Sequence, residues 1–352
     1  MYKKFFMGIA AIAALTLVSC SSDDLNSFSD NSSKNEAISF DGYLGRSAVA
    51  VNGSRGSEET KDKLKTDGFG VFGNYNSTGG QNFGSNLFNN EKVYSSSSTE
   101  PVTWTYTNTK YWPTDGHVDF LAYAPHVKDT KLKNKTDDPK KVLSCIDFTV
   151  SPTITEQKDL LWANATNKTK ADGTVTFNFN HALSRLGYTV KLNDDYTGTT
   201  IKLNKITLAG SNDGTKQAFY KTGIIDLSYT SSTTSPTTSL WAPSEEKQDF
   251  EWYSGDDQLS KTTAVENPKT KYLFVIPQNF KTGTDQLYVI VEYTITYSDK
   301  TTVKTKVCKQ LEKEFLQGKA YTINLTIGLT PIEFNAEVAD WGNIEDYPIT
   351  LE

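Results

Sequence analysis

One run of eleven residues decides the fold class: Leu287-Tyr-Val-Ile-Val-Glu-Tyr-Thr-Ile-Thr-Tyr297. Apolar and polar side chains alternate along most of it, which is the period of a β-strand with one buried face. Ser298-Asp-Lys300 reads as a turn, and the polar and apolar residues of Thr302–Cys308 follow it. The run therefore predicts a long antiparallel hairpin in a sheet that covers a core.

The same alternation recurs through the chain. Val175–Phe179 and Tyr321–Ile327 are predicted strands, and Ile201–Leu208 alternates with a slip in the middle that predicts a β-bulge. Tyr272–Ile276 is a continuous apolar run closed by Pro277, which is typical of a strand buried on both faces. Long helical patterns are hard to find, and polar loops separate the strands. We therefore predict an all-β fold of two tandem β-sandwich domains with Greek-key connections.

The 352 residues suit two domains of ordinary size behind an export segment. Asn193-Asp-Asp-Tyr-Thr-Gly198 is a turn-rich break between two predicted strands and is the expected domain boundary. The predicted organisation is a lipoprotein signal peptide at residues 1–19, a flexible tether at 20–36, an N-terminal domain at 37–195 and a C-terminal domain at 196–352.

The N-terminus has the pattern of a bacterial lipoprotein signal. Two lysines precede the apolar run Phe5–Val18, which is shorter than the roughly 20 residues of a membrane-spanning helix. The run ends in Leu17-Val-Ser-Cys20, which resembles a lipobox, and the Cys20 thiol is the predicted site of lipidation. Ser21-Ser-Asp-Asp24 follows, either as a surface-export signal or as part of an ordinary flexible tether. We expect the chain to reach the outer membrane through this lipid.

Charge excludes one class of partner. Removing residues 1–19 leaves 34 basic against 42 acidic residues, a formal charge of −8. A nucleic-acid partner would require a basic face, so none is expected.

Beyond Cys20 the sequence has two cysteines, Cys145 and Cys308, both in strand-like surroundings. They could pair with each other, but two buried free thiols are the favoured reading.

The sequence offers no recognisable catalytic or metal site, and we expect neither an enzyme nor a cofactor. The three histidines, His117, His126 and His181, lack the spacing of metal ligands. His181 is expected to hydrogen-bond locally, in a turn after a strand. Ser184 lacks the glycines of a nucleophile elbow. The paired aspartates are expected to form turns rather than a calcium site.

Aromatic residues leave a ligand site open. Trp104 and Tyr106 share one face of a predicted strand and are expected to belong to the core. Trp241 and Trp252 bracket a polar, acidic loop at residues 244–249 and are the better candidates for a platform that stacks on sugar rings.

A set of short segments, in order along the chain, resembles one known family. The segments are Ile38-Ser-Phe40, Leu44-Gly-Arg46, Asp67–Phe72, Tyr111-Trp-Pro113, Val118–Pro125, Asp159–Ala163, Phe179–Leu186 and Val338–Trp341. Together with the lipobox they resemble the fimbrillin family, the subunits of type V pili. The resemblance implies two transthyretin-like domains, export as a lipoprotein, and a location at the outer membrane and in the pilus.

The resemblance also implies a maturation step. An Arg-specific protease would cut after the first strand, and the groove that this strand leaves would accept a donor strand from another pilin subunit. The first strand is expected at Ile38–Leu44, and the polar stretch after it contains only Arg46 and Arg55. Arg55 is favoured because glycines flank it at Gly53-Ser-Arg-Gly56, where the backbone can extend into a protease.

Three questions stay open at this level. The C-terminal segment, Ile332–Val338 with Trp341–Glu352, is either a donor strand or the last strand of its own domain, as in a tip subunit. The chain is a shaft, tip or anchor subunit, and host glycans or proteins are possible partners. The alternative function is that of a non-polymerising glycan-binding surface lipoprotein.

Overall fold

The computed structural model describes residues 36–44, 59–95, 97, 102–134, 143–230, 240–268, 271–282, 284–329 and 333–340. Met1–Asn35 and Glu36–Glu352 form separate units, and the second contains all the elements described below. Its regular structure is almost entirely β, which confirms the predicted fold class. The described helices are α1 (Lys61–Asp67) and two 3-10 turns, Ile154–Glu156 and Lys170–Asp172. None of them is long and apolar enough to cross a membrane.

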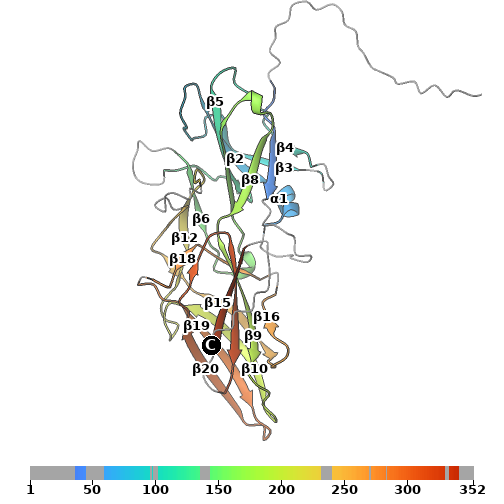
Figure 1. Cartoon of the computed structure of the whole chain (residues 1–352), viewed down its shortest axis with the longest axis vertical. Coiled ribbons are helices and arrows are strands. Elements are labelled where there is room, and N and C mark those ends of the chain that lie inside the picture. The colour runs from blue at the N-terminus through green and yellow to red at the C-terminus, as the bar shows by residue number, and fades with distance from the viewer. Residues whose placement is uncertain are drawn as a thin grey trace, which may run out of the picture. The chain divides into compact units, whose positions relative to one another are not determined.

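The first half of the chain builds a seven-stranded sheet. Its strands, in spatial order, are β1 (Phe40–Leu44), β8 (Val175–His181), β7 (Leu161–Lys168), β5 (His117–Ala124), β2 (Phe69–Asn76), β3 (Phe88–Ser95) and β4 (Trp104–Thr105). Figure 1 shows β1, in blue, beside the much later β8, in green. An aromatic-rich core built on Phe69, Phe88, Phe120 and Phe177 lies against this sheet.

The second half builds two larger sheets and three small ones. The four-stranded sheet has the order β15 (Phe250–Gln258), β10 (Thr200–Ala209), β19 (Tyr288–Thr296) and β20 (Thr302–Gln310). The five-stranded sheet contains β16 (Val265–Glu266), β9 (Ser184–Leu192), β22 (Lys319–Ile327) and β23 (Glu333–Asp340), with β17 (Leu273–Val275) also paired to β9. The small sheets are β13 (Trp241–Pro243), β12 (Thr222–Asp226) and β6 (Cys145–Thr149); β11 (Phe219–Tyr220) and β14 (Lys247–Gln248); and β18 (Gln278–Asn279) and β21 (Glu314–Phe315).

The strands predicted from alternation form where expected. β19 and β20 pair antiparallel from Tyr288↔Gln310 to Thr296↔Thr302. The turn between them places Lys300 at a φ of 69°. β10 has a register shift between Leu203 and Lys205, which confirms the predicted bulge. β17 is fully buried, as its continuous apolar run predicts.

Sheet partners change earlier in the chain than the expected boundary at 193–198. β8 ends at His181 in the first sheet, whereas β9 begins at Ser184 and pairs with β22 and β17 of the second half. β6 also pairs with β12 rather than with strands of the first sheet. The exact domain ranges stay a prediction.

Cys145 and Cys308 are not joined to each other by a disulfide. Cys145 is buried, as expected, but the expectation is wrong for Cys308, which is exposed because β20 is an edge strand that few residues cover. For the chain expressed without residues 1–20, we expect a maleimide to label one thiol in the native state and two after denaturation. The variant Cys308→Ser should show no native labelling, and labelling of Cys145 in the folded protein would contradict this placement.

Candidate functional site

The first strand is the best candidate for a functional element, because β1 terminates the seven-stranded sheet and β8 is its one partner among the described strands. The pairing is parallel and runs from Phe40↔Val175 to Leu44↔Phe179. Side chains of β1 alternate between buried and exposed. Phe40, Gly42 and Leu44 face the core, while Tyr43 is 48% exposed. Tyr43 therefore does not contribute to the apolar face of the strand.

Phe40 sits at the centre of the apolar cluster. Its ring centroid lies 5.3 Å from that of Phe88, 5.6 Å from that of Phe120 and 5.8 Å from that of Phe177. Ile38 is also buried, so the segment inserts three large apolar side chains into the sandwich. Each buried side chain of this size contributes about 1.5–3 kcal/mol, which makes the groove under β1 a strong binding site for a strand.

A second wall covers β1 on the side opposite β8. The Tyr106 hydroxyl donates to the carbonyl oxygen of Ile38 at 2.7 Å, and the Trp104 Nε1 donates to Asp41 Oδ1 at 3.0 Å. The Ile38 amide donates to the carbonyl oxygen of Lys110 at 2.8 Å. Trp104 and Tyr106 pack against the core, as expected. Their role as a wall of this groove was not apparent from the sequence, because only the fold brings them to β1.

The groove is narrow at one position. A Cβ atom placed on Gly42 would lie 3.0 Å from Phe69 Cε1 and 3.2 Å from Trp104 Cζ2. Such contacts are tighter than ordinary van der Waals separations. Any larger residue at the centre of the strand would therefore require Phe69 or Trp104 to move, and glycine fits this position without such a shift.

A buried acidic cluster holds the chain where it emerges from the predicted cleavage loop. The Glu59 amide donates to Asp159 Oδ2 at 3.1 Å, and His181 Nδ1 lies 2.7 Å from the same oxygen. Asp159 lies 22 residues from His181 in the sequence, so this contact depends on the fold. Burial raises the pKa of Glu59 to about 8, although Lys63 Nζ lies 3.7 Å from its carboxylate. Glu59 is thus a buried carboxyl that carries its proton at neutral pH.

The predicted processing and lipidation residues, Arg46, Arg55 and Cys20, lie outside the described residues. The predicted tryptophan platform is wrong as an exposed surface, because β13 and β15 turn both indoles inward. Trp241 is 6% exposed and donates through Nε1 to the carbonyl oxygen of Ala182 at 2.8 Å. Trp252 is 5% exposed and packs edge-on against Tyr188. Neither offers a ring face to solvent.

The histidines have ordinary neighbours. His117 Nε2 lies 3.4 Å from Asp119 Oδ2 on the same strand. Within the described ranges, no group of three or more His, Cys, Asp and Glu side chains is arranged to hold a metal ion.

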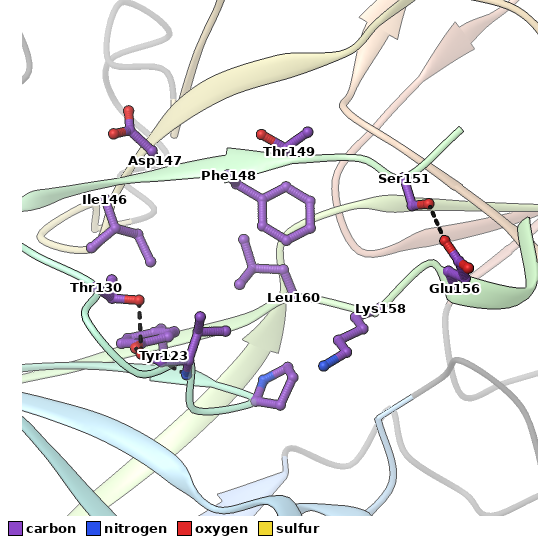
Figure 2. A pocket seen from close by; sticks show the side chains of 12 residues that line it. Tyr123, Thr130, Ile146, Asp147, Phe148, Thr149, Ser151, Glu156, Lys158 and Leu160 are labelled. Carbon is purple, nitrogen blue, oxygen red and sulfur yellow. Dashed lines mark hydrogen bonds between the residues drawn. The ribbon is translucent and has the colours of Figure 1, made fainter. Parts of the chain in front are cut away.

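A pocket of about 270 Å³ opens beside β6 (Figure 2). Apolar side chains dominate its lining, and Figure 2 shows the ring of Phe148 directed toward Leu160. Asp147, Glu156 and Lys158 supply charges around it, and all three are exposed. This arrangement suits an apolar group rather than a polar ligand, since apolar side chains make up most of the lining.

Layered, mostly antiparallel sheets and an apolar groove filled by β1 define an all-β sandwich protein. The chain belongs to the fimbrillin-like family, whose model matches residues 58–341. This is a family of fimbrial structural proteins. No match to the chain was found among curated proteins.

Three solved structures are similar to the chain to different degrees. A fimbrial protein from Bacteroides vulgatus is 21% identical, with a TM-score of 0.65 over 87% of this chain and all of that one. A candidate cell adhesion protein from Bacteroides uniformis is 18% identical (TM-score 0.49; 87% of this chain, 99% of that one). The tip fimbrial protein Mfa3 from Porphyromonas gingivalis, with a C-terminal truncation, is 13% identical (TM-score 0.36; 78% and 93%). The first of these confirms the β-sandwich fold.

Proposed function

We propose that the protein is a pilus subunit, exported as a lipoprotein through Cys20, released by Arg-specific cleavage and assembled by donor-strand exchange at the cell surface. Cleavage between β1 and α1 would free β1, and a strand of another subunit would then occupy the groove. The arrangement of β1 supports this proposal best. It is a terminal strand of five residues that nonetheless buries the most central ring of an aromatic core.

The energetics favour a replacement strand over an empty groove. A strand in this position gains several main-chain hydrogen bonds, each about 1 kcal/mol net, besides burying three apolar side chains. Before ordering costs, the sum is on the order of 10 kcal/mol. Since the donor and acceptor surfaces of a subunit differ, repeated exchange gives an open filament rather than a closed ring.

The donor strand has a candidate within this chain. β23 contains Phe334-Asn-Ala-Glu-Val338, in which large, small and large residues alternate as they do in Phe40-Asp-Gly-Tyr-Leu44. β23 pairs antiparallel with β22 at the edge of its own sheet, and Val338 is 48% exposed. Its central residue, Ala336, adds only a Cβ at the narrow point of the groove, which Phe69 and Trp104 would accommodate by shifting a few tenths of an ångström. Residues 341–352, the other part of the predicted donor, lie outside the described residues.

Limited digestion tests the proposal. We expect an Arg-specific protease to cut the purified protein once, after Arg55, and the product to form SDS-resistant oligomers. Arg55→Ala should abolish the cut and the oligomers together. Arg46→Ala is the matched control, because it removes the other arginine of the same stretch and should leave both outcomes unchanged. N-terminal sequencing of the product identifies the bond.

Two results would count against this function. Resistance of the wild-type protein at both arginines would remove the maturation step and favour a non-polymerising surface lipoprotein. A clean cut that leaves β1 bound and produces no oligomers would separate cleavage from strand exchange.

A further inference from the structure

A second pocket lies away from the β1 groove, among the small sheets of the second half. Its volume is about 420 Å³, within the range of small-molecule sites. The strands β11, β13 and β18 contribute to its lining, together with the segment that precedes β19 and with Gln317. Polar and apolar atoms share the lining, in contrast to the apolar pocket beside β6.

Rigid apolar groups form part of the walls. The Tyr220 ring is half-buried, and Lys247 Nζ lies 5.3 Å from its centroid. Pro243 and Pro277 also line the pocket, as does Trp241, whose indole the hydrogen bond to Ala182 holds in place. These groups lose little conformational entropy when a ligand packs on them. They suit the C–H face of a ring-shaped ligand.

Unengaged polar groups lie on the same pocket. Within the part of the chain that the structure describes, neither the Tyr220 hydroxyl nor the Gln317 amide has a hydrogen-bond partner. A hydroxyl both donates and accepts, and an amide presents a donor and an acceptor side by side. A ligand rich in hydroxyl groups can use both.

The only carboxylate among the described lining residues is already neutralised. Asp285 forms an ion pair with Lys247, and its Oδ2 accepts from Gln278 Nε2 at 2.9 Å. Gln278 is buried and also donates to the carbonyl oxygen of Ala218, so the Asp285 carboxylate is fixed in orientation. The paired charges leave no net attraction for an anion or a cation. The carboxylate oxygens keep spare lone pairs that accept from neutral hydroxyl groups.

We propose that this pocket binds a neutral saccharide. The Tyr220 ring, Pro243 and Pro277 support the sugar ring, while Gln317, the Tyr220 hydroxyl and Asp285 bind its hydroxyl groups. The inference goes beyond strand exchange and does not depend on it, because none of these residues belongs to β1 or to the wall of its groove.

Ligand-observed NMR on the purified, uncleaved protein tests the pocket. The probes are the methyl glycosides of glucose, galactose, mannose and N-acetylglucosamine at millimolar concentration, with N-acetylneuraminic acid as the charged comparison. We expect saturation transfer to at least one neutral glycoside and none to the acid. Tyr220→Phe and Gln317→Ala should each weaken binding about 3- to 10-fold, the effect of one lost hydrogen bond.

Gln286→Ala is the matched control, because Gln286 is exposed next to Asp285 but does not line the pocket. It should bind as the wild type does. The proposal is overturned if no neutral glycoside binds, if the acid binds more tightly, or if binding survives both substitutions unchanged. All these measurements use monomeric protein, so a failure of pilus assembly would leave their meaning intact.

Discussion

Phe40→Ala is expected to lower the free energy of unfolding of the uncleaved protein by about 3–5 kcal/mol, the usual cost of truncating a buried phenylalanine. The ring is 4% exposed and packs against four other aromatic rings, so the substitution leaves a cavity in the core. Urea denaturation followed by circular dichroism measures the loss.

The same substitution has a second, more specific outcome. If β1 departs on maturation, the oligomers formed after cleavage no longer contain Phe40 in the groove, and their SDS resistance should equal that of the wild type. Tyr43→Ala is the control on the same strand, because Tyr43 points outward. It should change the free energy of unfolding of the uncleaved protein by less than about 1 kcal/mol. Weakened oligomers of the Phe40 variant would mean that β1 stays in place.

Glu59→Gln is expected to remove a large part of the pH dependence of stability. Burial raises the pKa of Glu59 to about 8 in the folded protein, against 4.5 as its ordinary value. The folded state therefore holds a proton that the unfolded state releases above pH 4.5. Stability is fully present below that pH and falls by about 1.4 kcal/mol per pH unit as pH rises toward 8.

The measurement compares the two proteins in urea at several pH values. Burial raises the pKa of Asp249 to about 6. Asp249 therefore also makes the free energy of unfolding fall with rising pH, but this contribution ends near pH 6. Between about pH 6 and 8, the free energy of unfolding of the variant should rise by about 2–3 kcal/mol relative to that of the wild type. Groups facing Glu59 are Lys63, Asp67, Asp159 and His181, and all are unchanged in the variant.

Glu312→Gln is the control for the loss of one exposed carboxylate and should follow the wild type at every pH. A Glu59 variant that runs parallel to the wild type from pH 6 to 8 would show that Glu59 ionises normally in the folded protein.

The strand content of this fold could be predicted wherever a strand has one buried face. The alternation in β19 and the slip in β10 reflect which side chains face the core and which face solvent. Both the hairpin and the bulge could therefore be predicted from the sequence. The continuous run of β17 predicted its burial for the same reason. These are local properties, and tertiary contacts need only be consistent with them.

Features that depend on distant partners could not be predicted in this way. Trp241 and Trp252 flank a polar loop in the sequence, yet each lies on an inward face because its strand belongs to a sheet whose register the local sequence does not fix. His181 finds Asp159 across the structure, and Glu59 is buried by the same association. Trp104 and Tyr106 form a groove wall only because β1 is brought to them.

If a strand of another subunit replaces β1, the tight space at Gly42 should make the groove selective among strands of similar hydrophobicity. In a mixture of secreted subunits, a donor strand with leucine or valine at the central position would clash with Phe69 and Trp104. Favourable contacts of its flanking residues would not remove this clash. A single small residue in the donor strand would then determine which subunit binds to the next. The order of subunits along a filament would then depend on the volume of one side chain at each junction.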